Sequence, residues 1–347
     1  MKRLILSGRY TGKLPSERAL AKELQVSRGT VNMALNELLA QGLLERRRGR
    51  GTFVPETVAE WRSGRAHIGK IIHVLFHDRP HVWGGRTWAG QMLHVLEQAA
   101  RPQGIMLAYH GLAPDDPHAI ADVLARVHMN QDAIGICTAS APIEASTAFR
   151  LMETGLPFVL IEWQLPDMQV NSVMFDSFEG GRLAGEHLAG LGHRRFAFVA
   201  AGIHSPSWDE RLAGFREALG ARGLGPPSEF TIENVDHLEV ENVRTFMKTA
   251  RPTGIFCFGD KVAAMVLIAL DTFGIRVPGQ VSVVGFGDET MGVAEPLQLT
   301  TVGGDINVVG RRCIELLLDE HALTRPKQVV IPVQLVVRKT TGPPPEE

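Results

Sequence analysis

Apolar positions between residues 14 and 54 recur at helical spacing and are followed by two short extended runs. Ser16 can cap a first helix and Ser27 a second, because a serine hydroxyl accepts a hydrogen bond from the first helical turn. The second helix is expected to bury one stripe, made of Val31, Ala34, Leu35, Leu38 and Leu39. Residues 45–54 (ERRRGRGTFV) then form two arms around glycines. The pattern predicts a helix-turn-helix followed by a β-wing.

From residue 68 onward, short apolar runs alternate with segments of helical spacing. This alternation is typical of α/β units around parallel sheets, in which ligands bind at the carboxyl ends of strands. Strands are predicted at 71–76, 105–109, 133–137, 158–161, 172–175, 195–200, 254–258, 282–285 and 329–337. Helices are predicted at 89–100, 181–191 and 209–222.

Positive charge is concentrated where the helix-turn-helix is predicted. Residues 1–70 contain 14 Lys and Arg against 6 Asp and Glu, a net charge of +8, whereas the whole chain contains 36 against 38. Residues 71–347 therefore carry a net charge of −10. A helix that is merely exposed to solvent does not require such a concentration of positive charge, whereas binding to the phosphates of double-stranded DNA does.

Residues 8–54 resemble the winged-helix domain of the GntR family of transcriptional regulators, through the phrases LPSER, VSRGTV and GLLERRRGRGTFV. The resemblance implies arginines at both helix starts, hydroxyls that hold phosphates or base edges, and a wing that reaches the minor groove. Together with the polar face of the second helix, it gives a predicted DNA-contacting set of Arg18, Ser27, Arg28, Thr30, Asn32, Arg48 and Gly49. Only residues 1–7 precede Gly8, where the family has a full helix, so either this helix is short or the true start lies upstream.

Tryptophans gather after the predicted strands. Of the five in the chain, Trp83 and Trp88 follow the first strand, Trp163 the fourth and Trp208 the sixth. The charged residues at strand ends or first helical turns include Arg211, Asp260 and Asp288. A single tryptophan more often packs in a core, but four beside charged groups predict an effector pocket with stacking walls and polar anchors.

Residues 68–341 resemble the effector domain of LacI/GalR-type repressors, whose fold is that of periplasmic sugar-binding proteins. The resemblance rests on phrases such as MFDSFEGGRLAGEHLAGLGHRRFAFVA, DERLAGFREAL and PTGIFCFGDKVAAMVLIALDTFGIRVPGQVSVVGFGDE. It implies that Arg211 and Asp260 hold the ligand. The phrase GFGD departs from the family's GFDD, so Gly287 replaces a residue that often touches the ligand. Whether Asp288 takes over that contact stays open. A GntR-type reader joined to this sensor resembles the arabinose-repressor subgroup.

The sequence thus predicts a winged helix-turn-helix at 1–54, a linker at 55–67, a two-lobed periplasmic-binding-protein-like sensor at 68–341 and a tail at 342–347. Lobe one is expected to contain 68–170 and 297–323, and lobe two 171–293 and 328–341, with three chain crossings as a hinge. We expect a cytoplasmic homodimer that acts as a repressor of its operator DNA under the control of a small molecule, a sugar.

Other classes of function lack their signals. No phosphate-binding loop or nucleophile elbow occurs, so no catalytic residue or cofactor is expected. His73, His77 and His81 fall on a strand and its loop, where their spacing does not converge on a metal. The N-terminus has no signal-peptide pattern, no apolar run spans a bilayer, and the three cysteines form no paired framework. A sugar-processing enzyme fused to a DNA reader and a transport-type binding protein remain alternatives.

Overall fold

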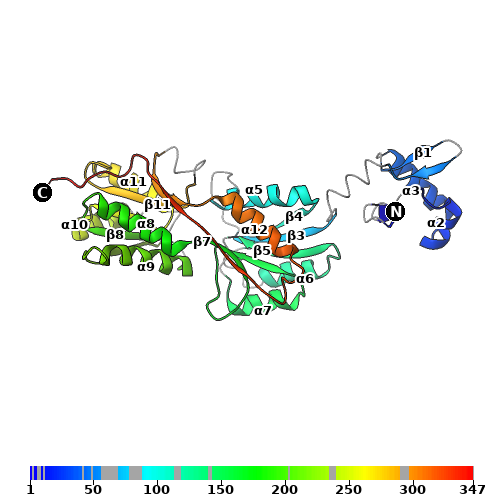
Figure 1. The fold of residues 1–347 in the computed structure, drawn as a ribbon, viewed down its shortest axis with the longest axis horizontal. Coiled ribbons are helices and arrows are strands. Elements are labelled where there is room, and N and C mark those ends of the chain that lie inside the picture. Colours follow the sequence, from blue (N-terminus) through cyan, green and yellow to red (C-terminus); the bar gives the residue numbers. More distant parts are fainter. Residues whose placement is uncertain are drawn as a thin grey trace.

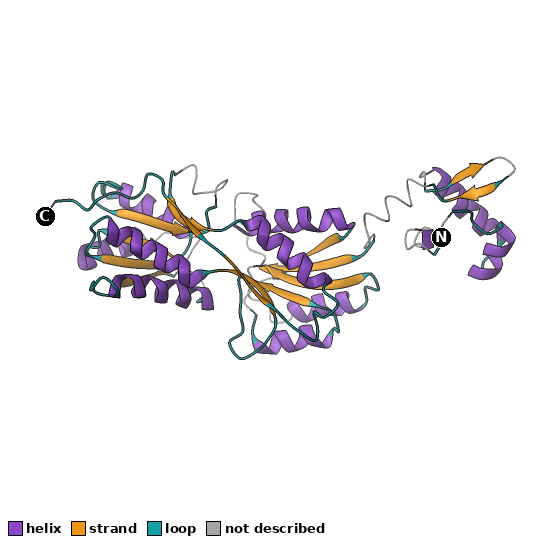
Figure 2. Ribbon diagram, viewed as in Figure 1, coloured by secondary structure: helices purple, strands orange, loops and turns teal. Residues whose placement is uncertain are grey.

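The computed structural model describes residues 1, 4–5, 9–10, 12–40, 43–47, 50–55, 69–77, 88–112, 119–139, 143–201, 204–233, 240–289 and 297–346. They form a winged helix-turn-helix and a two-lobed α/β unit (Figure 1). Each lobe has strands at its centre and helices outside them (Figure 2). The fold class predicted from the sequence is confirmed. Within these ranges no helix is long and apolar enough to cross a membrane.

The winged helix-turn-helix contains α2 (Glu17–Leu24), α3 (Arg28–Ala40), β1 (Glu45–Arg47) and β2 (Gly51–Phe53), with β1 antiparallel to β2. Both predicted caps are present. Ser16 Oγ accepts from the Ala19 N–H at 3.3 Å, and Ser27 Oγ accepts from the Thr30 N–H at 3.1 Å. These bonds satisfy backbone donors that have no partner inside the helix, which fixes where each helix begins.

This unit has its own hydrophobic core. Val31, Leu35 and Leu38 of the predicted stripe are buried, and they pack with Leu20 of α2 and Val54 beyond the wing. Ala34 and Leu39 are only partly buried. The stripe therefore holds α3 against α2 and the wing, and leaves the opposite face of α3 to solvent.

Lobe one contains β3 (Ile71–His77), α5 (Trp88–Ala100), the 3₁₀ helix η1 (Arg101–Gln103), β4 (Met106–Leu112), α6 (Ala119–His128), β5 (Ala133–Ala139), α7 (Ala145–Glu153), β6 (Phe158–Ile161), β7 (Asn171–Phe175), α12 (Ile306–Leu318) and β13 (Gln328–Ile331). Its described strands form one parallel sheet in the order β13-β7-β6-β5-β3-β4. Helix α12 packs beside α5 on this lobe (Figure 1).

Lobe two contains α8 (Ser177–Gly190), β8 (Phe196–Ala201), α9 (Pro206–Gly220), β9 (Ser228–Ile232), α10 (Val240–Ala250), β10 (Gly254–Cys257), α11 (Asp260–Thr272), β11 (Ser282–Phe286), β12 (Thr300–Gly303) and β14 (Gln334–Val336). The sheet order is β14-β12-β11-β10-β8-β9 among the described strands. All neighbours are parallel except β14, which is antiparallel to β12.

The sequence missed two strands and merged two others. β9 lies at a sheet edge and has few apolar residues, and β12 contains two threonines, so neither gives an apolar run. The predicted strand 329–337 is in fact β13 and β14, which belong to different sheets. Pro332 lies between them, and proline cannot donate to a strand ladder.

The predicted lobe boundaries are wrong at all three crossings. β7 pairs with β6 and β13 in lobe one, although residues from 171 onward were assigned to lobe two. β12 pairs with β11 in lobe two, and β13 with β7 in lobe one, again opposite to the prediction. The chain completes each strand before it crosses, and apolar runs do not indicate which sheet a strand joins.

The three crossings pack against one another. The Asp176 N–H donates to the Ile331 carbonyl at 2.9 Å. A Cβ at Gly304 would lie 2.7 Å from both the Phe175 ring and the Pro332 carbonyl oxygen, so only glycine fits there. The Phe175 ring contacts the Phe286 ring of lobe two with centroids 6.4 Å apart. The segments that join the lobes therefore form one contact cluster.

Helices α8 and α9 approach unusually closely. A Cβ at Gly181 would lie 1.9 Å from the Arg211 carbonyl oxygen, and one at Gly214 would lie 1.9 Å from that of Phe178. No side chain can be accommodated at either distance without moving a helix. This crossing fixes the position of α9, the helix that carries Arg211.

Candidate functional site

The solvent-facing surface of α3 is polar and exposed. The Arg28 side chain is 70% exposed and Thr30 is exposed as well, as is Arg18 on the preceding helix α2. Ser27 Oγ lies 2.8 Å from Thr30 Oγ1 in addition to capping the helix. An exposed helix face with hydroxyl, amide and guanidinium groups has the chemistry that reads base edges in a major groove.

Glu17, the first residue of α2, organises this surface. Its carboxylate accepts a hydrogen bond from Asn32 Nδ2 at 3.1 Å. It also pairs at 3.8 Å with both Arg28 on α3 and Arg46 on β1. Asn32 Oδ1 in turn accepts from Asn36 Nδ2 at 2.9 Å. One carboxylate on α2 therefore contacts polar groups on both α3 and β1.

The Arg47 side chain on β1 is held by two neighbours within the wing. Arg47 Nε donates to Glu45 Oε1 at 2.8 Å, and the Arg47 guanidinium lies 4.7 Å from the centre of the Phe53 ring. The wing-tip residues of the predicted set, Arg48 and Gly49, lie outside the described residues. The described part thus supplies a basic strand pair beside the exposed face of α3.

Arg211 on α9 is the centre of a second, buried group of charges where the lobes meet. Its guanidinium donates to the Phe258 carbonyl at 2.6 Å and to Ser177 Oγ at 3.3 Å. It lies over the Phe286 ring, 3.5 Å from the centroid, and over the Phe258 ring at 4.5 Å. The side chain is 7% exposed, and burial lowers the pKa of Arg211 to about 10 against the opposing effect of Glu162.

Glu162, which follows β6 of lobe one, reaches Arg211 in lobe two. Its Oε2 lies 3.5 Å from Arg211 Nη2, and its Oε1 accepts from the Phe175 N–H at 2.7 Å. Its backbone adopts φ 55°, a left-handed conformation that is costly for a residue with a side chain. Burial raises the pKa of the Glu162 carboxyl to about 7, although Arg211 acts in the opposite direction.

Asp260, the first residue of α11, is fully buried with both oxygens occupied. Thr301 Oγ1 donates to Oδ1 at 2.5 Å, and the Glu289 N–H donates to Oδ2 at 2.8 Å. A Cβ at Gly285 would lie 2.2 Å from Oδ1. Burial raises the pKa of Asp260 to about 6, while these two hydrogen bonds act to lower it.

The loop after β11 adds two further carboxylates. Asp288 has φ 49° and accepts from Arg338 Nη2 at 2.7 Å. Glu289 accepts a hydrogen bond from the backbone N–H of Trp88 at the start of α5, and burial raises the pKa of Glu289 to about 8. Gly287 has φ 126°, a backbone conformation that glycine adopts readily and other residues rarely. We call Glu162, Arg211, Asp260, Asp288, Glu289 and Arg338 the interlobe cluster.

The structure places the predicted tryptophans differently from one another. Trp83 lies outside the described residues. Trp88 begins α5 beside Glu289. Trp163 packs on the core of lobe one beside α6 and α7, and its Nε1 donates to the Ile143 carbonyl at 2.8 Å. Trp208 is 9% exposed and lies 5.7 Å, ring to ring, from Phe258, which also stacks on Arg211. Trp88 and Trp208 are thus the described tryptophans beside the cluster.

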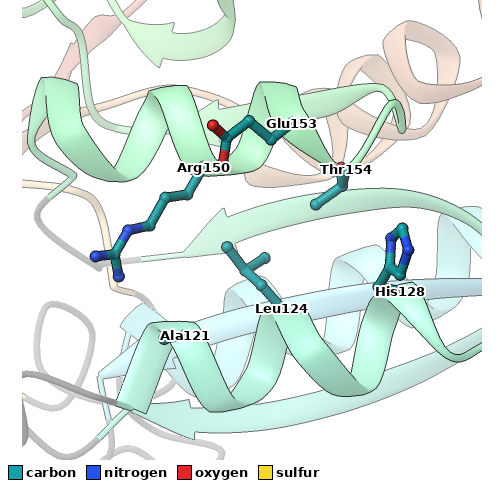
Figure 3. A pocket seen from close by; sticks show the side chains of 6 residues that line it. All are labelled: Ala121, Leu124, His128, Arg150, Glu153 and Thr154. Atoms are coloured by element: carbon teal, nitrogen blue, oxygen red, sulfur yellow. The ribbon is translucent and has the colours of Figure 1, made fainter.

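A surface hollow lies elsewhere on lobe one, between α6 and α7 (Figure 3). Leu124 and His128 of α6 face Arg150 and Glu153 of α7 across it (Figure 3). It contains none of the residues that the sequence predicted to bind an effector.

Sequence reasoning missed Glu17, Glu162 and Glu289, although each organises a predicted site. Glu17 directly follows the Ser16 cap, and this position beside the second helix start was a usable signal. Glu162 precedes Trp163 at a predicted strand end, so it satisfied the same rule as the tryptophan. Nothing in the local pattern marks Arg338, which reaches Asp288 from the last segment of the chain.

Comparison with known proteins agrees with both units. Residues 1–54 match the model for bacterial regulatory proteins of the gntR family, and residues 186–341 match that for a periplasmic binding protein-like domain. The chain is similar to the arabinose metabolism transcriptional repressors of Halalkalibacterium halodurans and Geobacillus stearothermophilus, each 26% identical over 95% of this chain and 91% of the relative.

Solved structures share the fold. The complex of the transcriptional regulator CelR with cellobiose is 25% identical, with a TM-score of 0.66 over 94% of this chain and 100% of that one. A LacI family transcriptional regulator from Enterococcus faecium with bound ribose is 22% identical, with a TM-score of 0.67 over 79% of this chain and 99% of that one.

Proposed function

Because the chain joins a GntR-family winged helix-turn-helix to a periplasmic-binding-protein-like unit, we propose that it is a transcriptional repressor controlled by a sugar. The observation that carries the proposal is the presence in one chain of an exposed α3 with an arginine-rich wing and of a buried Arg211 and Asp260 where two lobes meet. The names of the arabinose-metabolism repressors support both the sign of regulation and the effector class.

The DNA-binding half of the proposal assigns base and phosphate contacts to the predicted set on α2, α3 and the wing. Arg28 is free to extend because its Glu17 partner lies 3.8 Å away and both side chains are partly exposed. Such a pair contributes little to stability, so DNA can replace it at small cost. The +8 charge of residues 1–70 supplies the attraction to the duplex.

The sensor half assigns the sugar to the interlobe cluster. Arg211 donates hydrogen bonds and the carboxylates accept them, which suits neighbouring hydroxyls of a sugar ring. At least one of the four predicted tryptophans stacks an apolar ring face on the C–H groups of the sugar, the four being Trp83, Trp88, Trp163 and Trp208. The sugar changes the angle between lobes through the three packed crossings, and so the spacing of two winged helices in a cytoplasmic homodimer.

The test is operator binding by the full-length protein, with DNA from upstream of its own gene and a panel of neutral sugars. We expect binding to the specific fragment to exceed binding to scrambled DNA by about 10³-fold or more. One sugar of the panel should release the fragment. Equal affinity for both fragments contradicts the DNA half, and specific binding that no sugar alters contradicts the sugar half.

The direct mutational test is Arg28→Ala, with Arg216→Ala on lobe two as the matched control. Arg216 is 49% exposed and pairs with Glu229 within lobe two. We expect Arg28→Ala to lower specific affinity by roughly 5- to 150-fold, the value of one good base contact, and Arg216→Ala to leave it unchanged.

A further inference from the structure

Two carboxylates of the interlobe cluster each cross from one lobe to a positive group on the other. Glu162 of lobe one pairs with the Arg211 guanidinium of lobe two at 3.5 Å. Glu289 of lobe two accepts from the Trp88 N–H at the start of α5 in lobe one. A helix N-terminus carries a partial positive charge, so it attracts an anion as a guanidinium does. Each lobe therefore offers a carboxylate to the other.

The described charges around this point are mostly negative. Carboxylates there are Glu162, Glu210, Asp260, Asp288 and Glu289, whereas the cations are Arg211, Arg338 and the exposed Lys261. Both guanidiniums already face carboxylates, Arg211 at 3.5 Å and Arg338 at 2.7 Å. An incoming anion would have to displace an internal carboxylate and then remain beside it. An uncharged hydroxyl can instead donate to the same oxygens.

We propose that Glu162 and Glu289 select the effector by charge: they accept hydrogen bonds from an uncharged polyhydroxy compound and exclude phosphorylated or carboxylated ones. The inference rests on the proposed function, because it requires the effector to bind at the interlobe cluster. The physical basis is that a carboxylate only accepts hydrogen bonds when it is ionised, so the selection is strongest above the raised pKa values of the two groups, about 7 for Glu162 and about 8 for Glu289. Repulsion between like charges is also strong where water is largely excluded, and it rejects the wrong ligand more effectively than added contacts would.

The test is calorimetric titration of the full-length protein with matched pairs of neutral and anionic sugars. The pairs are L-arabinose with L-arabinonate and D-ribose with D-ribose 5-phosphate. A pH of about 9 keeps both carboxylates ionised, since the pKa values of Glu162 and Glu289 are raised to about 7 and about 8. We expect the neutral member of at least one pair to bind roughly 100-fold or more tightly than its anionic partner.

The variants Glu162→Gln and Glu289→Gln identify the source of the discrimination. Glutamine keeps the shape, removes the charge and adds an N–H donor. The affinity for the anionic sugar should therefore rise, and the ratio of neutral to anionic affinity should fall about tenfold in each variant. Glu320→Gln, which removes a carboxylate from an 89% exposed side chain, is the matched control and should leave the ratio at the wild-type value.

The outcomes separate this inference from the function on which it rests. Equal or tighter binding of the anionic members overturns the charge selection and leaves the sugar-controlled repressor standing. A wild-type ratio in both glutamine variants also overturns it, because other groups then exclude the anion. If no member of either pair binds and no sugar of the panel releases operator DNA that is still bound specifically, the sugar half of the proposed function fails and this inference fails with it. If a glutamine variant does not fold, equal or tighter binding of the anionic members by the wild type still overturns the selection.

Discussion

Arg28 and Arg211 are the same residue type in opposite environments. Arg28 is 70% exposed on α3, with its carboxylate partner 3.8 Å away. Arg211 is 7% exposed, donates to a carbonyl at 2.6 Å and lies between two aromatic rings. An exposed cation retains its hydration and can exchange partners, as binding to a phosphate backbone requires. A buried one is held by many contacts, so it costs more to remove and positions its ligand more narrowly.

Salt should separate the two sites most strongly. Operator affinity is expected to fall by about 10³-fold or more between 50 and 200 mM salt, because six or more phosphate contacts release counterions. Sugar affinity should change less than about twofold over this range, because buried pairs are poorly screened. Fluorescence anisotropy of labelled operator and calorimetry of the sugar measure the two quantities. The same salt dependence for both affinities would contradict the difference between an exposed DNA site and a buried sugar site.

Removal of each arginine should give different losses of stability. Arg211→Ala leaves the Glu162 carboxylate buried without its cation, and should lower the free energy of unfolding of the sensor by about 3 kcal/mol. Arg28→Ala should change the free energy of unfolding by less than about 0.5 kcal/mol, since its partner remains in water. Urea denaturation of both variants tests this. A loss of similar size in Arg28→Ala is the contrary result.

A finer change at Asp260 tests whether the buried site depends on acceptors. Asp260→Asn keeps the shape, but its amide N–H₂ must face either the Thr301 hydroxyl, which can rotate, or the Glu289 N–H, which cannot. We expect a loss of roughly 1–3 kcal/mol in sugar affinity. Asp271→Asn, at an exposed position on the same helix, is the control and should bind as the wild type does. Wild-type affinity in Asp260→Asn would show that the sugar does not depend on this carboxylate.

The smallest expected effect is a pH dependence confined to the sensor. Burial raises the folded-state pKa of Glu289 to about 8, above its ordinary value of 4.5, so the folded protein holds this proton more tightly than the unfolded chain does. The resulting stability is fully present below pH 4.5 and is lost as pH rises through about 8. Between pH 6 and 9 the free energy of unfolding should therefore fall by on the order of 1 kcal/mol less in Glu289→Gln than in the wild type. Thermal melts across this range give the comparison, and identical curves would contradict it.

The sequence alone determined the helix starts and most of the buried stripe of the winged helix-turn-helix. Ser16, Ser27 and the stripe through Val31, Leu35 and Leu38 lie within a few positions of the groups they contact. Helical period and capping are local properties of a chain, so a single sequence contains them. Even there, the joining of α2, α3 and the wing by Glu17 required the folded arrangement, because its partners Arg28 and Arg46 are on other elements.

Only the tertiary structure decided how the sensor's pieces combine. The apolar runs located most of its strands, but assigned β7, β12 and β13 to the wrong lobes, because an apolar run fits either sheet equally well. The partners of the two predicted ligand-binding residues could not be read from the chain for the same reason. Glu162 meets Arg211, and Glu289 meets Asp260, only after sheets and crossings have packed. Burial and charge pairing at this point depend on contacts between distant segments, and local sequence patterns do not encode them.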